Sequence, residues 1–193
     1  MGKGYLCLMQ LNIPPIIDVL YQEFLEIISF LNTSQEPSLC GHTNRSFTKM
    51  LALSIGSYFE YEVQQMLIEF VGSKTQNDVR VINFLRKKAI IMQYHTYFNW
   101  GEKDRIDKPG KNANSFFALF GEDFKNSVND DIKSSPELDE SVKAFIELGH
   151  IRNILVHSNF AAYSFDNKTT DELYNLYKKA VGFLDYLRHK LLS

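Results

Sequence analysis

The chain has few of the residues on which small stapled or metal-bound folds depend. Only two of its 193 residues are cysteines, Cys7 and Cys40, and they form no C-x-x-C pair. Disulfide scaffolds, zinc knuckles and thioredoxin-type sites need more cysteines or closer ones. These classes therefore have no support, and we expect two reduced thiols.

Long hydrophobic runs are also missing. No stretch approaches the roughly 18 uncharged apolar residues that a membrane helix needs. Residues 1–11 are apolar, but they include one lysine and no small-x-small cleavage site, and residue 6 is leucine where N-myristoylation requires Ser or Thr. We therefore expect a cytoplasmic protein with no membrane partner.

An excess of charge of one sign is the third absence. The 21 Lys and Arg residues nearly balance 23 Asp and Glu residues, for a net charge of −2, which argues against a histone-like polycation. This balance hides a polarity, because residues 74–111 carry nine basic and four acidic side chains, whereas residues 122–147 carry three and eight. Local positive charge is therefore available for a nucleic acid.

What the chain does have is helical periodicity. Apolar residues recur three or four positions apart through most of the sequence, and 15 Phe and 10 Tyr can fill a core. We predict an all-α fold, an antiparallel helical bundle in a single domain over 1–193. Helices are predicted over about 16–31, 46–71 and 77–92, over two short pieces near 115–120 and 124–132, and from Pro136 and Thr169 onward. A loop is expected over 32–44, so that 1–45 forms a helix and loop, and 94–135 forms an insertion.

One short motif carries chemistry. Residues 152–157 read R-N-x-x-x-H, and on a helix Asn153 and His157 lie one turn apart, with Arg152 about 140° round from His157. Arg152 can hold a phosphate, His157 can transfer a proton near neutral pH, and Asn153 can orient the imidazole. In RNA the 2′-OH is an internal nucleophile, so this chemistry requires no metal. Gly149, one turn earlier, leaves room for another backbone to approach.

The spacing alone is weak support for catalysis, since an Arg and a His five residues apart also occur by chance. A basic side chain near a helix C-terminus also interacts favourably with the helix dipole.

Three further segments accompany the motif in a fixed order. They are S-Y-F-E at 57–60, N-S-F-F-A-L-F-G at 114–121 and K-T-T-D-E-L-Y at 168–174. Together with R-N-I-L-V-H-S-N-F at 152–160, they resemble the RiboL-PSP-HEPN branch of the HEPN superfamily over roughly residues 45–190.

The resemblance implies a metal-independent endoribonuclease with no cofactor, which cleaves tRNA or mRNA. It implies a homodimer whose two motifs line one cleft, with Arg152, Asn153 and His157 as site residues and Glu60 as the acidic member. Such proteins are often toxins or antiviral effectors that an antitoxin or a sensor or ATPase partner restrains. Other HEPN domains are catalytically silent, so a helical interaction module or regulatory partner in such a complex is the alternative.

Several other residues stay open at this point. Glu60 either orients Arg152 or tunes His157, or it is a surface glutamate beside Glu62. His150 is expected to be exposed, where it can touch a substrate. The insertion combines aromatic and basic side chains, which suits single-stranded RNA but also suits a solvated loop packed on the bundle. The RNA-binding candidates there are Trp100, Lys103, Arg105, Lys108 and Lys111. No metal ligands are predicted.

Overall fold

The computed structural model describes residues 15–102, 105–165 and 168–193, and most of these residues lie in helices. In these ranges no strand forms apart from an isolated bridge between Gly101 and Pro109, so the predicted all-α class is confirmed. Within the same ranges, no helix is both long and apolar enough to cross a membrane. The elements are α1 (Ile16–Thr33), α2 (Pro37–Lys74), α3 (Val79–Leu85), a π-helical turn η1 (Arg86–Ile90), α4 (Tyr94–Tyr97), α5 (Asn114–Phe117), a 3-10 turn η2 (Ala118–Phe120), α6 (Glu122–Ser134), α7 (Pro136–His157) and α8 (Thr170–Leu192).

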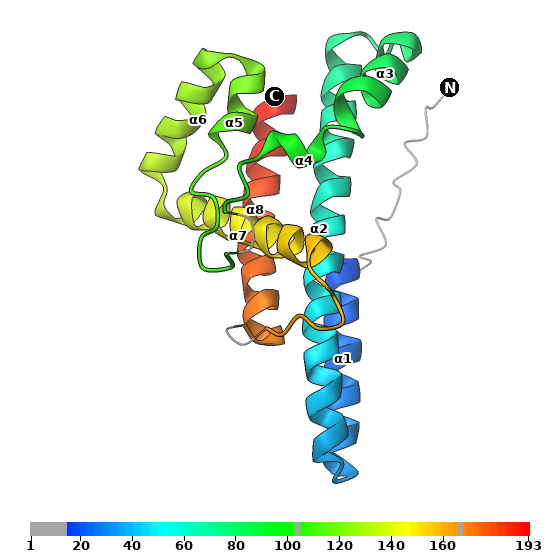
Figure 1. Cartoon of the computed structure of the whole chain (residues 1–193). Coiled ribbons are helices and arrows are strands. Elements are labelled where there is room, and N and C mark those ends of the chain that lie inside the picture. Colours follow the sequence, from blue (N-terminus) through cyan, green and yellow to red (C-terminus); the bar gives the residue numbers. More distant parts are fainter. Residues whose placement is uncertain (1–14, 103–104, 166–167) are drawn as a thin grey trace, which may run out of the picture.

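Helix α7 is the crossing element of the bundle. It packs against both α8 and α2, and in Figure 1 it runs across the directions of these two helices. Phe145 of α7 is fully buried where the elements meet, with its ring centroid 5.2 Å from Phe59 of α2, 5.1 Å from Phe183 of α8 and 5.1 Å from Phe98 of the insertion. The aromatic residues that are abundant in the sequence therefore form the centre of the core.

Local signals in the sequence set the ends of α7 and α8. The Ser135 hydroxyl accepts a hydrogen bond from the Leu138 amide, and Pro136 occupies the first helical turn. Thr169 and Glu172 form a capping box at the start of α8, which confirms the helix start predicted at Thr169. The last turns of α7 carry the R-N-x-x-x-H motif. Because α7 begins and ends at defined residues, this motif has a fixed position over α2.

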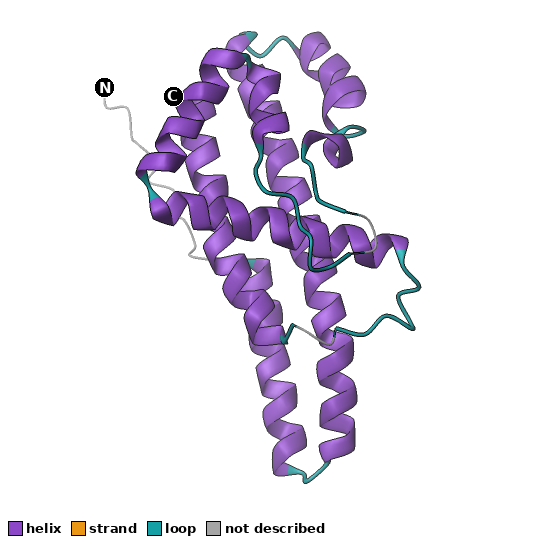
Figure 2. Ribbon diagram, turned by 60° about the vertical axis from the view of Figure 1, so that its left-hand side comes forward, coloured by secondary structure: helices purple, strands orange, loops and turns teal. Residues whose placement is uncertain are grey.

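The prediction of a loop over 32–44 is wrong for most of these residues. Only residues 34–36 separate α1 from α2, with Gln35 at a φ of 55°, and α2 begins at Pro37. Ser, Thr and Gly are poor helix formers, but propensity is a weak prior, and packing of α1 along α2 overrides it here. The resulting hairpin projects beyond the rest of the bundle in Figures 1 and 2, which explains why Ile27, predicted to face the core, is 47% exposed.

The predicted helix over 77–92 is interrupted. It begins after Asp78, whose side chain accepts from the Arg80 amide, and it changes into the π-helical turn η1 at Arg86. A π-turn adds one residue per turn, so the apolar face changes register. Ile90 is buried, whereas Met92, which the regular period places on the inner face, is 64% exposed.

Candidate functional site

The motif at the end of α7 forms one wall of a groove. Arg152, Asn153 and His157 line it from α7, Glu60 lines it from α2, and Tyr94 and His95 line it from α4. The groove has a volume of about 600 Å³, within the range of small-molecule sites. All four predicted catalytic residues therefore surround one space.

Arg152 is held by an acidic partner. Its Nη2 donates to Glu60 Oε2 at 3.2 Å, and the two side chains are 27% and 29% exposed. Glu62, the other acidic candidate, instead accepts from Arg188 at 3.1 Å on a different side of α2. Of the open alternatives for Glu60, the structure therefore favours the one in which this carboxylate orients Arg152.

A glycine in α2 makes this arrangement possible. A Cβ atom at Gly56 would lie 2.4 Å from Arg152 Cγ and 2.8 Å from Arg152 Cβ, well inside contact distance. The stem of Arg152 therefore lies directly on the α2 backbone, and a glycine at this position fixes where the guanidinium can reach.

His157 is exposed at the end of α7, and Asn153 is half-buried one turn earlier. Among the described residues, no side-chain hydrogen bond is made by either of them, so the expected contact between Asn153 and the imidazole is not formed. The His157 ring is free to rotate toward a substrate in the groove.

Trp100 closes one side of the groove. Its ring lies where a Cβ at Gly149 would be, 2.0 Å from the nearest ring atom, and its Nε1 donates to the His95 carbonyl at 3.2 Å. The gap expected at Gly149 is therefore real, but a side chain fills it, not a backbone. Trp100 is half-buried and lines the groove. Because its ring lies on Gly149 and its Nε1 donates to the His95 carbonyl, its main contacts are with the bundle.

The insertion also contributes two groups to the groove that sequence reasoning missed. His95 is exposed and lies along the same groove as His157. Tyr94 is buried, and burial, reinforced by the Glu60 carboxylate, raises the pKa of its phenol well above the ordinary value. Neither residue belongs to the motif, and only the fold of residues 94–100 places them beside Arg152.

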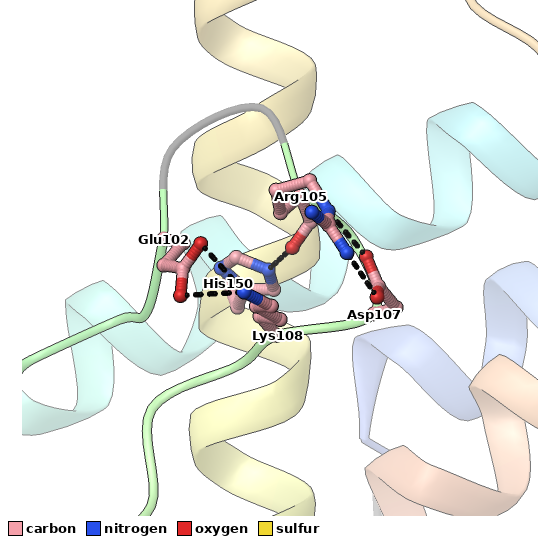
Figure 3. Close-up of polar contacts among 5 residues, drawn as sticks. All are labelled: Glu102, Arg105, Asp107, Lys108 and His150. Carbon is pink, nitrogen blue, oxygen red and sulfur yellow. Dashed lines mark hydrogen bonds and ion pairs between the residues drawn. The ribbon is translucent and has the colours of Figure 1, made fainter.

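His150 is buried, which contradicts the prediction that it is exposed. It is 1% exposed, and its Nε2 donates to the Arg105 carbonyl at 2.8 Å (Figure 3). The expectation of an exposed histidine that touches RNA is therefore wrong. Although His150 lies two turns before His157, the insertion loop covers it, and its role is to anchor that loop.

The basic side chains of the insertion loop are largely neutralised within the loop. Arg105 forms a two-point ion pair with Asp107 at 2.8 and 3.0 Å, and Lys108 pairs with Glu102 at 3.0 Å (Figure 3). Lys111 is exposed, and Lys103 lies outside the described residues. The loop is therefore a weaker candidate for phosphate binding than its sequence suggests.

A comparison with protein families gives one match. The family model described as RiboL-PSP-HEPN matches residues 18–193. The match includes nearly all of α1, so this N-terminal helix belongs to the family region. The resemblance seen in the sequence covered only residues from about 45 onward. No curated protein matches the chain. No solved structure matches it.

Proposed function

The chain belongs to the RiboL-PSP-HEPN family, and on that premise we propose that it is a metal-independent endoribonuclease that cleaves tRNA or mRNA in the cytoplasm. The observation that carries the proposal is the groove itself, where Arg152, held by Glu60, lies along one wall with His157. A fixed guanidinium and a free imidazole are the two groups that cleavage by an internal 2′-OH requires.

In the proposed reaction the 2′-oxygen attacks the adjacent phosphorus while its proton passes to a base. The bond from phosphorus to the 5′-oxygen then breaks, and the leaving oxygen takes a proton from an acid. The products are a 2′,3′-cyclic phosphate and a 5′-OH end. Arg152 stabilises the charge that builds up on the phosphorane, and His157 serves as the base or the acid.

A base and an acid both act in one turnover, and a second imidazole that could work with His157 is available from two sources. His95 lines the same groove in the same chain. The other source is His157 of a second copy, as in the homodimer that the family resemblance implies.

The test is cleavage of labelled RNA by the purified chain in EDTA, with analysis of the new ends. We expect cutting to persist and to leave 2′,3′-cyclic phosphate and 5′-OH ends. Arg152→Ala and His157→Ala are each expected to lower the rate by at least about 10²-fold, as loss of a transition-state donor or a proton-transfer group does. Complete loss of cutting on chelation would contradict the metal-free mechanism.

Glu60 and Glu62 form a matched pair for testing how Arg152 is oriented. Both lie on α2, and each accepts from one arginine, Arg152 or Arg188. Glu60→Gln is expected to lower the cleavage rate about tenfold, because a neutral amide holds the guanidinium less firmly. Glu62→Gln should leave the rate unchanged, and equal losses in both variants would show that Glu60 has no special role.

The projecting α1–α2 hairpin favours a second candidate, a catalytically silent module that pairs with a larger protein. Phe30 near its tip is 68% exposed and Leu39 is 51% exposed, an apolar surface that suits an antitoxin or sensor. Expression toxicity distinguishes the candidates. If wild type and His157→Ala are equally harmless and neither cuts RNA, the interaction module is the better account.

A further inference from the structure

The segment formed by α3 and η1 has a buried side and an exposed side, although it is short. Ile90 is 4% exposed, and Ile82 and Leu85 are half-buried, so this side packs toward α2. On the exposed side, Phe84 is 63% exposed and Met92 is 64% exposed. Both large apolar side chains are therefore available for contact with a ligand.

The same exposed segment carries cations without acidic partners. Arg86, Lys87 and Lys88 are exposed and make no ion pair with any described residue. Arg80, by contrast, is neutralised by Asp78 at 2.7 Å. Since Arg105 and Lys108 are paired within their loop (Figure 3), most of the unpaired positive charge among the described residues of 74–111 lies on η1.

This surface continues into the groove. Ile91, the residue that directly follows η1, lines the groove beside Arg152, and so does His95 of α4. In Figure 1, α3 and α4 follow one another along the upper half of α2. The π-turn at Arg86–Ile90 therefore ends at the groove, and π-turns are frequent at functional sites.

We propose that the exposed face of α3 and η1, comprising Phe84, Arg86, Lys87, Lys88 and Met92, binds single-stranded RNA next to the groove. This inference rests on the proposed function. The cations contact backbone phosphates, and a base stacks on the Phe84 ring, which is the combination that single-strand binding proteins use. The surface binds the RNA strand on one side of the bond that is cut. It therefore determines the affinity for longer RNA and does not change the rate of the chemical step.

The experiment measures binding of a fluorescent single-stranded RNA of about 15 nucleotides, in the His157→Ala background so that no cleavage is needed. Lys87→Ala with Lys88→Ala is expected to weaken binding about tenfold or more and to reduce the salt slope of log K by about 1.4, since each phosphate contact on a single strand contributes about 0.7. Phe84→Ala is expected to weaken binding about tenfold through lost stacking. The matched control is Lys178→Ala with Lys179→Ala, an adjacent exposed lysine pair on α8, which should bind as the parent does.

Three results would overturn the proposal. They are equal weakening by both lysine pairs, no change with the η1 variants, or no binding by the parent protein. If Phe84→Ala instead changes the molecular mass in light scattering while RNA affinity stays the same, the face binds protein and the proposal is wrong. Cleavage of a dinucleotide, which has no further nucleotides to bind the face of α3 and η1, tests the proposed function separately. Cleavage can fail while binding of longer RNA to this face persists, and binding to this face can fail while the dinucleotide is still cut.

Discussion

Gly56→Ala is the sharpest test of how the fold positions the site. The substitution adds one methyl group to α2, on no proposed catalytic residue. The new Cβ would lie 2.4 Å from Arg152 Cγ and 2.8 Å from Arg152 Cβ. Ordinary carbon contacts are about 3.5–4.0 Å, so Arg152 has to move by about 1 Å. Because the clash involves the base of the side chain, rotation of the guanidinium alone does not relieve it.

The substitution is expected to change the cleavage rate much more than the free energy of unfolding. A misplacement of about 1 Å can lower an enzymatic rate about 10²-fold, which is about 2.7 kcal/mol of activation free energy. Overpacking costs about 1–3 kcal/mol of unfolding free energy, and the better helix propensity of alanine offsets about 1 kcal/mol of that. A net loss of about 0–2 kcal/mol leaves a typical domain folded. The Gly56→Ala variant should therefore be folded but should cleave RNA slowly.

The assay is the single-turnover rate of RNA cleavage, with circular dichroism and thermal melting as checks on folding. Gly41→Ala is the matched control in the same helix, because its Cβ would meet only Arg45 Nη1 at an ordinary 3.7 Å. We expect the control to cut at the wild-type rate. A folded Gly56→Ala protein that also cuts at that rate would refute the argument that the position of Arg152 matters.

Three other predictions follow from the same structure. If each cleavage uses Arg152 of one protomer and His157 of the other, mixing Arg152→Ala with His157→Ala chains should restore cleavage above either variant alone, and no restoration would exclude that division of roles. His150→Ala should lower the unfolding free energy by about 1–3 kcal/mol in urea titrations, because it removes a buried ring together with its hydrogen bond to the Arg105 carbonyl. The Arg105 guanidinium lowers the pKa of Asp107 to about 2, so their ion pair should persist above that pH and be lost as pH falls through it, as an NMR titration of the carboxyl carbon would show.

Helix starts and the placement of the R-N-x-x-x-H motif on one helix could be predicted from the sequence because their causes are local. Ser135 and Thr169 cap the helices that they were predicted to cap, and the spacing of Arg152 and His157 needs only the geometry of one helix. The pairing of Arg152 with Glu60 joins residues 92 positions apart, so only the family resemblance suggested it.

The errors arose where tertiary packing overrides local signals. The polar stretch before Ser46 is helical because α1 packs along it, and His150 is buried because a loop 45 residues earlier covers it. The π-turn after Leu85 could not be predicted from a regular helical period, and the unpaired cations Arg86, Lys87 and Lys88 lie on it.

The most direct measurement of the central claim is the sequencing of RNA ends from cells that express wild type beside cells that express Arg152→Ala. If the groove is a ribonuclease site, wild type produces new 5′-OH ends at a limited set of positions in tRNA or mRNA, and the variant produces none. The same ends in both samples, or none in either at matched expression of folded protein, would contradict it.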